Sequence, residues 1–133
     1  MKIARSLLDQ MIDHARCDAP AECCGAVGVR DGVATRVYPV ENIAPDSLKP
    51  LKFEMGIDLF HALEDMEEQG AELGAIYHSH TRTAPYPSQT DQNWSEQYPD
   101  AEWIIIGTAE DEPEVRTYRV TKSSVEEVEL EIQ

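Results

Sequence analysis

One stretch, Ile76–Asp91, restricts how this chain can fold more than any other part of the sequence. It begins as an apolar strand, places His78 and His80 at the end of that strand, and crosses a proline-bearing loop before it reaches Asp91. Because side chains alternate between the two faces of a strand, His78 and His80 point the same way and Ser79 points the opposite way. The stretch therefore predicts a strand, a loop and a returning segment that share one polar site.

The polar side chains of this site are ligands that suit a catalytic zinc ion. Two imidazoles about 7 Å apart along one face of a strand can converge on one ion, and a carboxylate returned by the loop completes a set of three. Three nitrogen and oxygen ligands with a fourth position open are typical of catalytic zinc, whereas structural zinc has four protein ligands. We predict that His78, His80 and Asp91 bind one Zn²⁺ per chain, with a bound water as the fourth ligand.

A longer pattern surrounds these ligands: two histidines one residue apart, then seven residues, then Ser88-x-x-Asp91. It resembles the motif of the JAMM (MPN+) metalloprotease family, which also carries a glutamate upstream. Glu22, within Pro20–Gly25, occupies the matching place. The resemblance covers nearly the whole chain and implies a single MPN domain over residues 1–133. Its expected fold is mixed α/β, with a central, mostly antiparallel sheet flanked by helices, similar to that of cytidine deaminases.

The resemblance also implies a reaction and two further residues. The reaction is zinc-dependent amide hydrolysis, in which a metal-bound water attacks a carbonyl carbon. Glu22 would take the proton of that water and later deliver one to the leaving amine. Ser88 would donate a hydrogen bond to the oxyanion that develops during the attack. We therefore expect Glu22 and Ser88 to be the catalytic residues beside the metal.

Within the family, this short chain without large insertions is similar to a bacterial branch, and the local match covers Tyr77–Thr81 and Ala84–Asp91. In that branch the substrate is a small ubiquitin-like sulfur carrier protein that ends in Gly-Gly and bears an added cysteine, which hydrolysis releases. A narrow channel suits such an end, because only glycine lets two backbones pass so closely. We expect this carrier to be the partner. Thr81 departs from the pattern, since many family members have proline there, and this alters the stiffness of the loop without removing a ligand.

Other interpretations of the same motif stay open. A related peptidase would act as an isopeptidase and remove such a carrier from lysines of other proteins. A non-catalytic MPN scaffold would act through protein contacts alone, although such scaffolds usually lack a ligand, and a zinc-storing module would have no use for Glu22. Ser88 and Asp91 also match a helix capping box, which is compatible with a catalytic role.

The three cysteines do not suggest a disulfide framework, because their number is odd and two of them are adjacent. Cys23 and Cys24 adjoin the proposed base, but neighbours on a strand face opposite ways, so at most one of them could face the site. We predict that both are small core residues. Cys17, at the end of the first predicted helix, has no visible role.

Charge and composition bear on the choice of partners. The net charge of −15 opposes nucleic-acid binding, which requires clustered Lys and Arg, and favours a partner with a basic face. No apolar run approaches the ~20 residues of a membrane span, and nothing resembles a signal peptide. We expect a cytoplasmic protein that binds neither nucleic acid nor a membrane. Such acidity also occurs in proteins adapted to high salt, and the oligomeric state is left open.

Hydrophobic periodicity outlines the remaining elements. Asp31-Gly32 predicts a tight hairpin, and the run 103–106, apolar on both faces, predicts a buried central strand. In the second helix, Phe60 and Met66 are expected to face inward. The alternation near the end of the chain predicts an edge strand with exposed glutamates. Helices are predicted near 3–16, 57–69 and 90–98, and strands near 24–29, 33–40, 51–55, 73–80, 103–106, 114–120 and 127–132.

Overall fold

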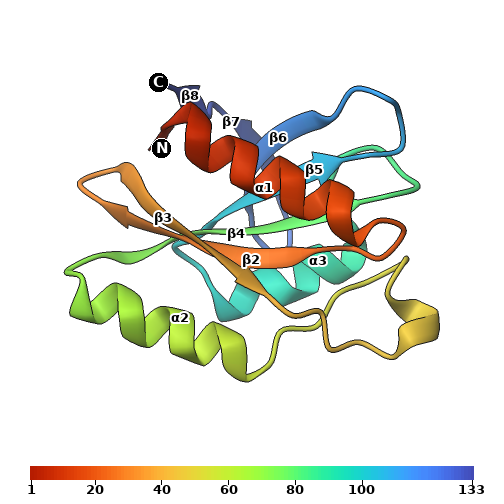
Figure 1. Cartoon of the computed structure of the whole chain (residues 1–133), viewed down its shortest axis with the longest axis horizontal. Helices are drawn as coiled ribbons and strands as arrows, with labels where there is room; N and C mark the ends of the chain where they lie inside the picture. Colours follow the sequence, from red (N-terminus) through yellow and green to blue (C-terminus); the bar gives the residue numbers. More distant parts are fainter.

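One sheet of eight strands forms the centre of the fold, and the computed structural model describes all of residues 1–133 (Figure 1). The strands are β1 (Lys2–Ile3), β2 (Cys24–Arg30), β3 (Val33–Val40), β4 (Glu72–His80), β5 (Glu102–Gly107), β6 (Glu114–Val120), β7 (Val125–Val128) and β8 (Glu131–Ile132). Their order in the sheet is β7-β6-β5-β4-β2-β3-β1-β8, so β4 lies in the middle. β1 pairs in parallel with β3 and β8, and β4 with β5, whereas all other neighbours are antiparallel.

Helices cover both faces of this sheet (Figure 1). They are α1 (Arg5–Asp18), α2 (Ile57–Glu68) and α3 (Gln89–Trp94), with short 3-10 turns at η1 (Asp46–Leu48) and η2 (Ser95–Gln97). α1 packs on one face, and α2 and the end of α3 pack on the other. None of the helices has both the length and the apolar composition that crossing a bilayer requires. The predicted mixed α/β fold, with a mostly antiparallel sheet flanked by helices, is confirmed.

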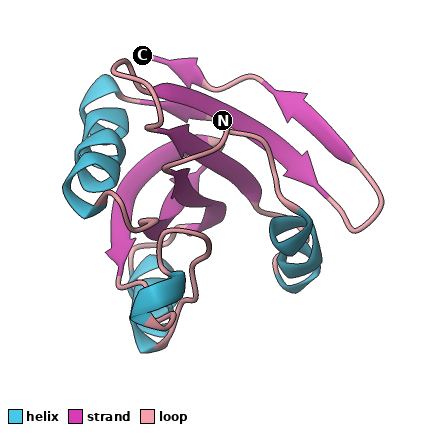
Figure 2. Ribbon diagram, turned by 90° about the vertical axis from the view of Figure 1, so that its right-hand side faces the viewer, coloured by secondary structure: helices cyan, strands magenta, loops and turns pink.

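The sheet curls so far that its two edges approach each other. β7 and β8 occupy opposite ends of the strand order, yet only Glu129 and Leu130 separate them in the sequence. Leu130 and Val115 of β6 both pack against the cluster that contains the buried side of α1. The sheet therefore wraps around α1, and Figure 2 shows its curvature from the side.

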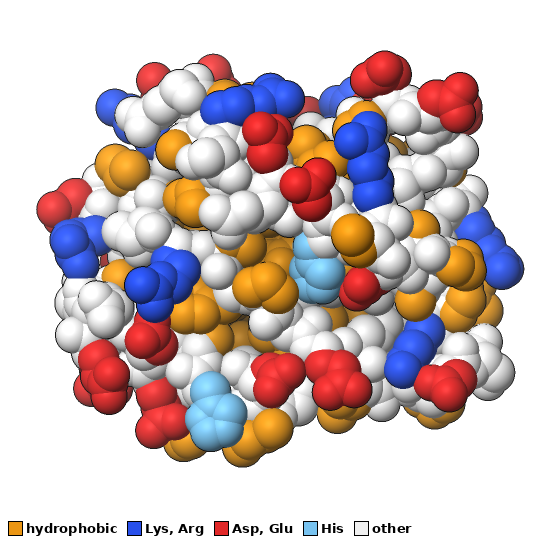
Figure 3. Space-filling view, viewed as in Figure 1, with side chains coloured by type: hydrophobic (Ala, Val, Ile, Leu, Met, Phe, Trp, Pro, Cys, Tyr) orange, Lys and Arg blue, Asp and Glu red, His pale blue; other side chains and the backbone are white.

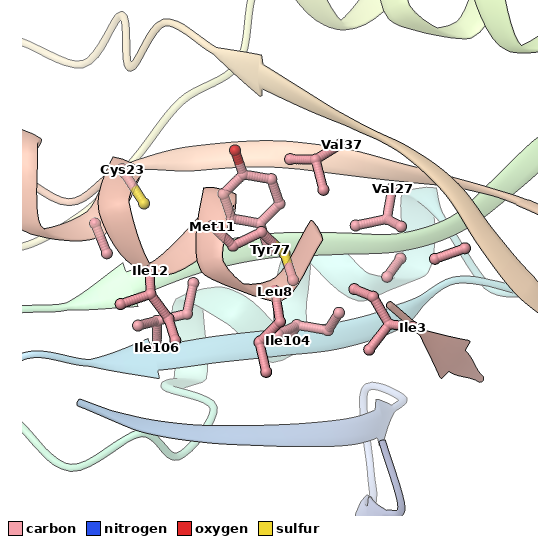
Figure 4. Close-up of a cluster of buried hydrophobic side chains, with 13 residues drawn as sticks. Ile3, Leu8, Met11, Ile12, Cys23, Val27, Val37, Tyr77, Ile104 and Ile106 are labelled. Atoms are coloured by element: carbon pink, nitrogen blue, oxygen red, sulfur yellow. The ribbon is translucent and has the colours of Figure 1, made fainter. Parts of the chain in front are cut away.

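The central strands contribute side chains to two separate cores. One core joins α1 to the sheet and contains Tyr77 and Ile104 (Figure 4). The other lies between the sheet and α2 and contains Ile76 and Trp103. Because successive residues face opposite ways, the run 103–106 is fully buried on both sides, as predicted. β4 and β5 are thus packed on both faces along most of their length, and this holds the end of β4 in place.

A two-residue turn joins β2 to β3. Asp31 and Gly32 both have positive φ, 51° and 77°, a conformation that an Asp-Gly pair adopts at little cost. The predicted hairpin is confirmed, and the observed bounds of β3 and β6 coincide with the predicted ones.

Three predicted details are wrong. Phe60 is 56% exposed, because Leu59 takes its place in the buried stripe of α2, which also contains Met66 as predicted. Residues 51–55 form no strand and contribute only an isolated bridge at Met55. The alternating C-terminal segment divides into β7 and β8, which lie on opposite edges of the sheet. In each case the local pattern fitted more than one arrangement, and packing against distant residues selected between them.

Candidate metal centre

The end of β4 places two imidazoles in contact. His78 is fully buried and His80 almost so, and their Nε2 atoms lie 3.0 Å apart. Ser79 faces the other side of the sheet, where its hydroxyl accepts a hydrogen bond of 2.8 Å from the Cys23 N–H. The alternation expected of a strand therefore brings both histidines to one point, as the spacing predicted.

The short helix α3 returns Asp91 to the same point. Its Oδ2 atom lies 3.1 Å from Nε2 of His78 and 3.3 Å from Nε2 of His80. The same Oδ2 accepts a hydrogen bond of 2.9 Å from the Ser88 N–H, and the Ser88 hydroxyl accepts one of 3.1 Å from the Asp91 N–H. This reciprocal pair is the capping box that the sequence suggested, and it fixes the direction in which Asp91 leaves the helix.

The three atoms of His78, His80 and Asp91 form a triangle whose size suits zinc. Its sides measure 3.0, 3.1 and 3.3 Å. Zinc bonds of ~2.0–2.1 Å in a tetrahedron place neighbouring ligand atoms roughly 3.3–3.4 Å apart, so the ion fits with shifts of a few tenths of an ångström. Two neutral nitrogens and one carboxylate oxygen are also a donor set that zinc accepts in catalytic sites.

Different contacts hold the two imidazole rings. Nδ1 of His80 lies 2.9 Å from the Ala84 carbonyl oxygen, which accepts a hydrogen bond from the Nδ1–H group and leaves Nε2 free to act as a ligand. The His78 ring packs against Phe53, with ring centroids 4.6 Å apart, and meets Trp103 edge-on at 5.8 Å. One ring is therefore oriented by a hydrogen bond and the other by aromatic packing.

Neighbouring groups shift the pKa values of two members of the triangle, Asp91 and His80. Burial alone would raise the pKa of the Asp91 carboxyl, but His78 and His80 hold it well below its usual range. Burial alone would lower the pKa of His80, but its hydrogen bonds to Asp91 and Ala84 raise it above the ordinary value. Asp91 is consequently ionised at neutral pH, as a metal ligand must be.

Glu22 lies just outside the triangle, at the start of the chain segment that leads into β2. Its carboxylate and the ring nitrogens of His78 and His80 all lie within 4.8 Å of one another. The side chain is buried, and its burial raises the pKa to about 8, an effect that His80 opposes and Asp91 reinforces. The structure thus brings all four predicted polar residues around one point, with Asp91 at ligand distance and Glu22 farther out.

A cavity of about 160 Å³ opens onto this cluster. Ser88 borders it with Glu22, His80 and Asp91, so the fifth predicted residue also faces the site. The opposite wall comes from the loop between β3 and α2, which supplies residues 51–53.

Sequence reasoning missed the contribution of that loop. Phe53 supports the His78 ring, and Asn42 donates a hydrogen bond to the Glu22 carbonyl. Neither residue belongs to a motif, and both lie more than twenty positions from the histidines in the sequence. Thr81 is also more than a loop residue, because its hydroxyl donates a hydrogen bond of 2.9 Å to the Pro20 carbonyl, two residues before Glu22.

The adjacent cysteines have the structural role that was predicted. Cys23 belongs to the core around α1, and Cys24 belongs to the core beneath α2. Burial raises the pKa of the Cys23 thiol to about 12 and also raises that of Cys24, so both stay protonated at neutral pH. Cys17 is exposed.

Acidic side chains dominate one margin of the molecule. In Figure 3 they gather along the lower edge of the view, over α2. That helix carries Asp58, Glu64, Asp65, Glu67 and Glu68 and not a single Lys or Arg.

The chain is similar to several named proteins. The profile that matches it, over residues 4–121, describes prokaryotic homologs of the JAB domain. A Mycobacterium tuberculosis protein named CysO-cysteine peptidase is 34% identical over 130 residues, which cover 94% of this chain and 86% of that protein. A Thermus thermophilus protein named probable TtuB-protein conjugate cleaving protease is 33% identical over 109 residues, or 80% of this chain and 69% of that protein.

Solved structures share the fold. A protein from Desulfitobacterium hafniense is 30% identical, with a TM-score of 0.86 over all of this chain and 93% of its own. A structure described as "JAMM: A Metalloprotease-like Zinc Site in the Proteasome and Signalosome" has a TM-score of 0.62 over all of this chain and 97% of its own. At 22% identity the second likeness concerns the fold alone.

The burial of Glu22 leads to a prediction about pH. In metal-free protein, Glu22→Gln should increase the free energy of unfolding above neutral pH. The raised folded-state pKa means that the wild type loses stability as pH rises from about 4.5 through about 8, a loss that the variant lacks. We expect the two proteins to have similar free energies of unfolding near pH 4.5 and to differ by up to about 5 kcal/mol above pH 8. Urea unfolding in chelator, with the exposed Glu68→Gln as control, measures this, and a difference independent of pH would contradict it.

Proposed function

This chain belongs to the prokaryotic JAB branch of the JAMM/MPN family, and we propose that it is a zinc peptidase that cuts after the C-terminal Gly-Gly of a ubiquitin-like sulfur carrier and releases cysteine. Its relatives are named as peptidases and proteases, and the chain is a hydrolase of this family. The observation that carries the proposal is the ligand triangle of His78, His80 and Asp91 with the buried Glu22 immediately outside it.

In the proposed reaction, Glu22 and Ser88 have different roles beside the metal. A bound zinc ion would supply a water of lowered pKa and polarise the substrate carbonyl. Glu22 accepts the water's proton and returns one to the leaving amine, a task for which a pKa near the working pH is well suited. The capping bond occupies a lone pair of the Ser88 oxygen, so the hydroxyl proton stays available for the developing oxyanion.

Three observations support a carrier with a slender C-terminal tail. The M. tuberculosis relative is named CysO-cysteine peptidase, and it aligns with 94% of this chain. The cavity at the site, at about 160 Å³, is smaller than the 300–1,000 Å³ typical of drug-sized ligands, and so suits an extended glycine chain. The acidic margin along α2 favours a partner with a basic face.

The nearest alternative is an isopeptidase that removes such a carrier from lysines of other proteins. The name of the T. thermophilus relative, a conjugate-cleaving protease, favours it. Both activities would use the same ligands and base, and they differ only in the leaving amine. A metal-free scaffold accounts less well for the site, because all three ligands and the base lie together in the fold.

The ligand assignment predicts metal content. Protein purified without chelator should carry about one zinc per chain, and His78→Ala or Asp91→Ala should lose most of it, because two ligands hold zinc far less well than three. His61→Ala is the matched control, since this histidine is exposed on α2. Elemental analysis provides the measurement. Full zinc in both ligand variants would show that other residues bind the metal.

The role assignment predicts that the catalytic residues differ from the ligands. Glu22→Gln should abolish turnover and leave zinc content and folding intact, because its carboxylate lies outside the ligand triangle. Ser88→Ala should lower kcat roughly 10²–10³-fold if the hydroxyl stabilises the oxyanion. Rates are measured per zinc-bound chain, with Glu68→Gln as control. Loss of zinc from Glu22→Gln would show that Glu22 is a metal ligand. A decrease in kcat of less than about tenfold in Ser88→Ala would show that this serine only caps the helix.

The substrate assignment predicts a preference among three compounds. The folded carrier bearing cysteine on its terminal glycine should be cut rapidly to free cysteine and an intact Gly-Gly end. A free Gly-Gly-Cys peptide should be a poor substrate in turnover as well as affinity, because binding energy from the carrier body contributes to the chemical step. Mass spectrometry follows both beside a lysine-linked carrier conjugate. Fast cleavage of the conjugate with an untouched cysteine adduct would establish the isopeptidase instead.

A further inference from the structure

Asn42, the second residue after β3, is buried and uses every hydrogen bond that its side chain can make. Its amide nitrogen donates to the carbonyl oxygens of Glu22, at 2.9 Å, and Lys52, at 3.1 Å. Its amide oxygen accepts from the N–H groups of Ala44, at 3.0 Å, and Glu54, at 3.2 Å. A side chain with two donors and two acceptors, all satisfied inside the protein, has a single orientation.

These bonds close the loop between β3 and α2 on itself. Asn42 bridges to Met55, and the Ile43 N–H donates to the Glu54 carbonyl at 2.9 Å, so the two ends of the loop lie side by side. The closed loop also places Phe53 against the His78 ring. One asparagine is therefore connected to the base, to the wall of the cavity and to the support of a ligand.

Glu22 depends on this loop because it lies before β2 begins. Its N–H donates to the Lys49 carbonyl at 2.8 Å, and its C=O accepts from Asn42. The loop thus forms hydrogen bonds with the peptide groups on both sides of the Glu22 Cα atom. The side chain itself makes no hydrogen bond within the protein, so its direction is set by this backbone and by packing.

We infer that Asn42 is a positioning residue for the base: through the Glu22 carbonyl it holds the carboxylate at the distance from the two histidines that proton transfer requires. The inference rests on the proposed function, because it assigns Asn42 a part in the same reaction. A displacement of about 1 Å at a catalytic group can cost on the order of 10²-fold in rate, so a single backbone contact of this kind can matter.

A purely structural Asn42 would have different consequences. If it only shaped the loop, its loss would disturb the cavity wall at residues 51–53 and weaken substrate binding, which raises KM. If it positions Glu22, its loss lowers kcat and leaves KM and zinc content nearly unchanged, because the ligand triangle comes from β4 and α3.

The experiment compares two substitutions at this position. Asn42→Ala removes all four hydrogen bonds. Asn42→Asp keeps both acceptor bonds to Ala44 and Glu54, but can no longer donate to the carbonyls of Glu22 and Lys52. It therefore retains the two acceptor bonds that close the loop while it removes the contact with the base. Asn93→Ala is the matched control, because Asn93 is the other asparagine of the chain and is exposed on α3. Zinc content, circular dichroism, kcat and KM are measured on the carrier–cysteine adduct and the lysine conjugate.

We expect both Asn42 variants to fold, to hold zinc as the wild type does, and to lose roughly 10- to 100-fold in kcat with KM within about threefold. The control should keep wild-type values. Either variant turning over at the wild-type rate per bound zinc would overturn the inference, as would a loss confined to KM or failure of both variants to fold. A wild type that cleaves neither substrate would instead overturn the proposed function, and this inference with it.

Discussion

The site depends on three polar atoms packed within 3.0–3.3 Å of one another where solvent hardly reaches. Two imidazoles and a carboxylate in such a place cost free energy unless they neutralise one another or share a cation. Asp91 responds with a pKa held far below its usual range. Glu22 lies outside the triangle, and the burial of its side chain raises its pKa to about 8, so this carboxyl can exchange protons near neutral pH. The proposed ligand Asp91 and the proposed base Glu22 therefore differ in position, although both are carboxylates.

The fold provides the rigidity that this arrangement requires. β4 is covered by one core around α1 and by another beneath α2, so the strand cannot move without disturbing both. Its two histidines are the fourth and sixth of six successive buried residues, Ala75–His80. Gly25 shows how close the packing is, because a Cβ atom there would lie 2.3 Å from the Tyr77 ring. Asp91 lies on a helix of only six residues, which has little stability of its own. The capping box with Ser88 stabilises this helix and orients Asp91.

Much of this could be predicted from the sequence, for reasons that lie in particular residues. The strand alternation of His78 and His80, the Asp31-Gly32 turn and the all-apolar run 103–106 are local properties that few other structures satisfy. The prediction for Phe60 failed because an amphipathic helix with apolar residues on neighbouring faces can rotate, and the core accepted Leu59 and Met66. The C-terminal alternation was interpreted as one strand, because no local sequence signal indicates that the sheet curls and places β7 and β8 on opposite edges.

The sequence by itself identified the proposed ligands, the proposed base and the strand that carries the histidines, because each is encoded by residue type and spacing within a short segment. Tertiary structure alone decided how those groups are held. Asn42, Lys49 and Phe53 reach the site from a loop with no motif, through a side-chain amide, a backbone carbonyl and an aromatic ring respectively. Such contacts form only when the loop closes against β2 and β4. This closure depends on residues that are far apart in the sequence. The residue types of the site can therefore be predicted from short segments of sequence, whereas their geometry depends on the folded chain.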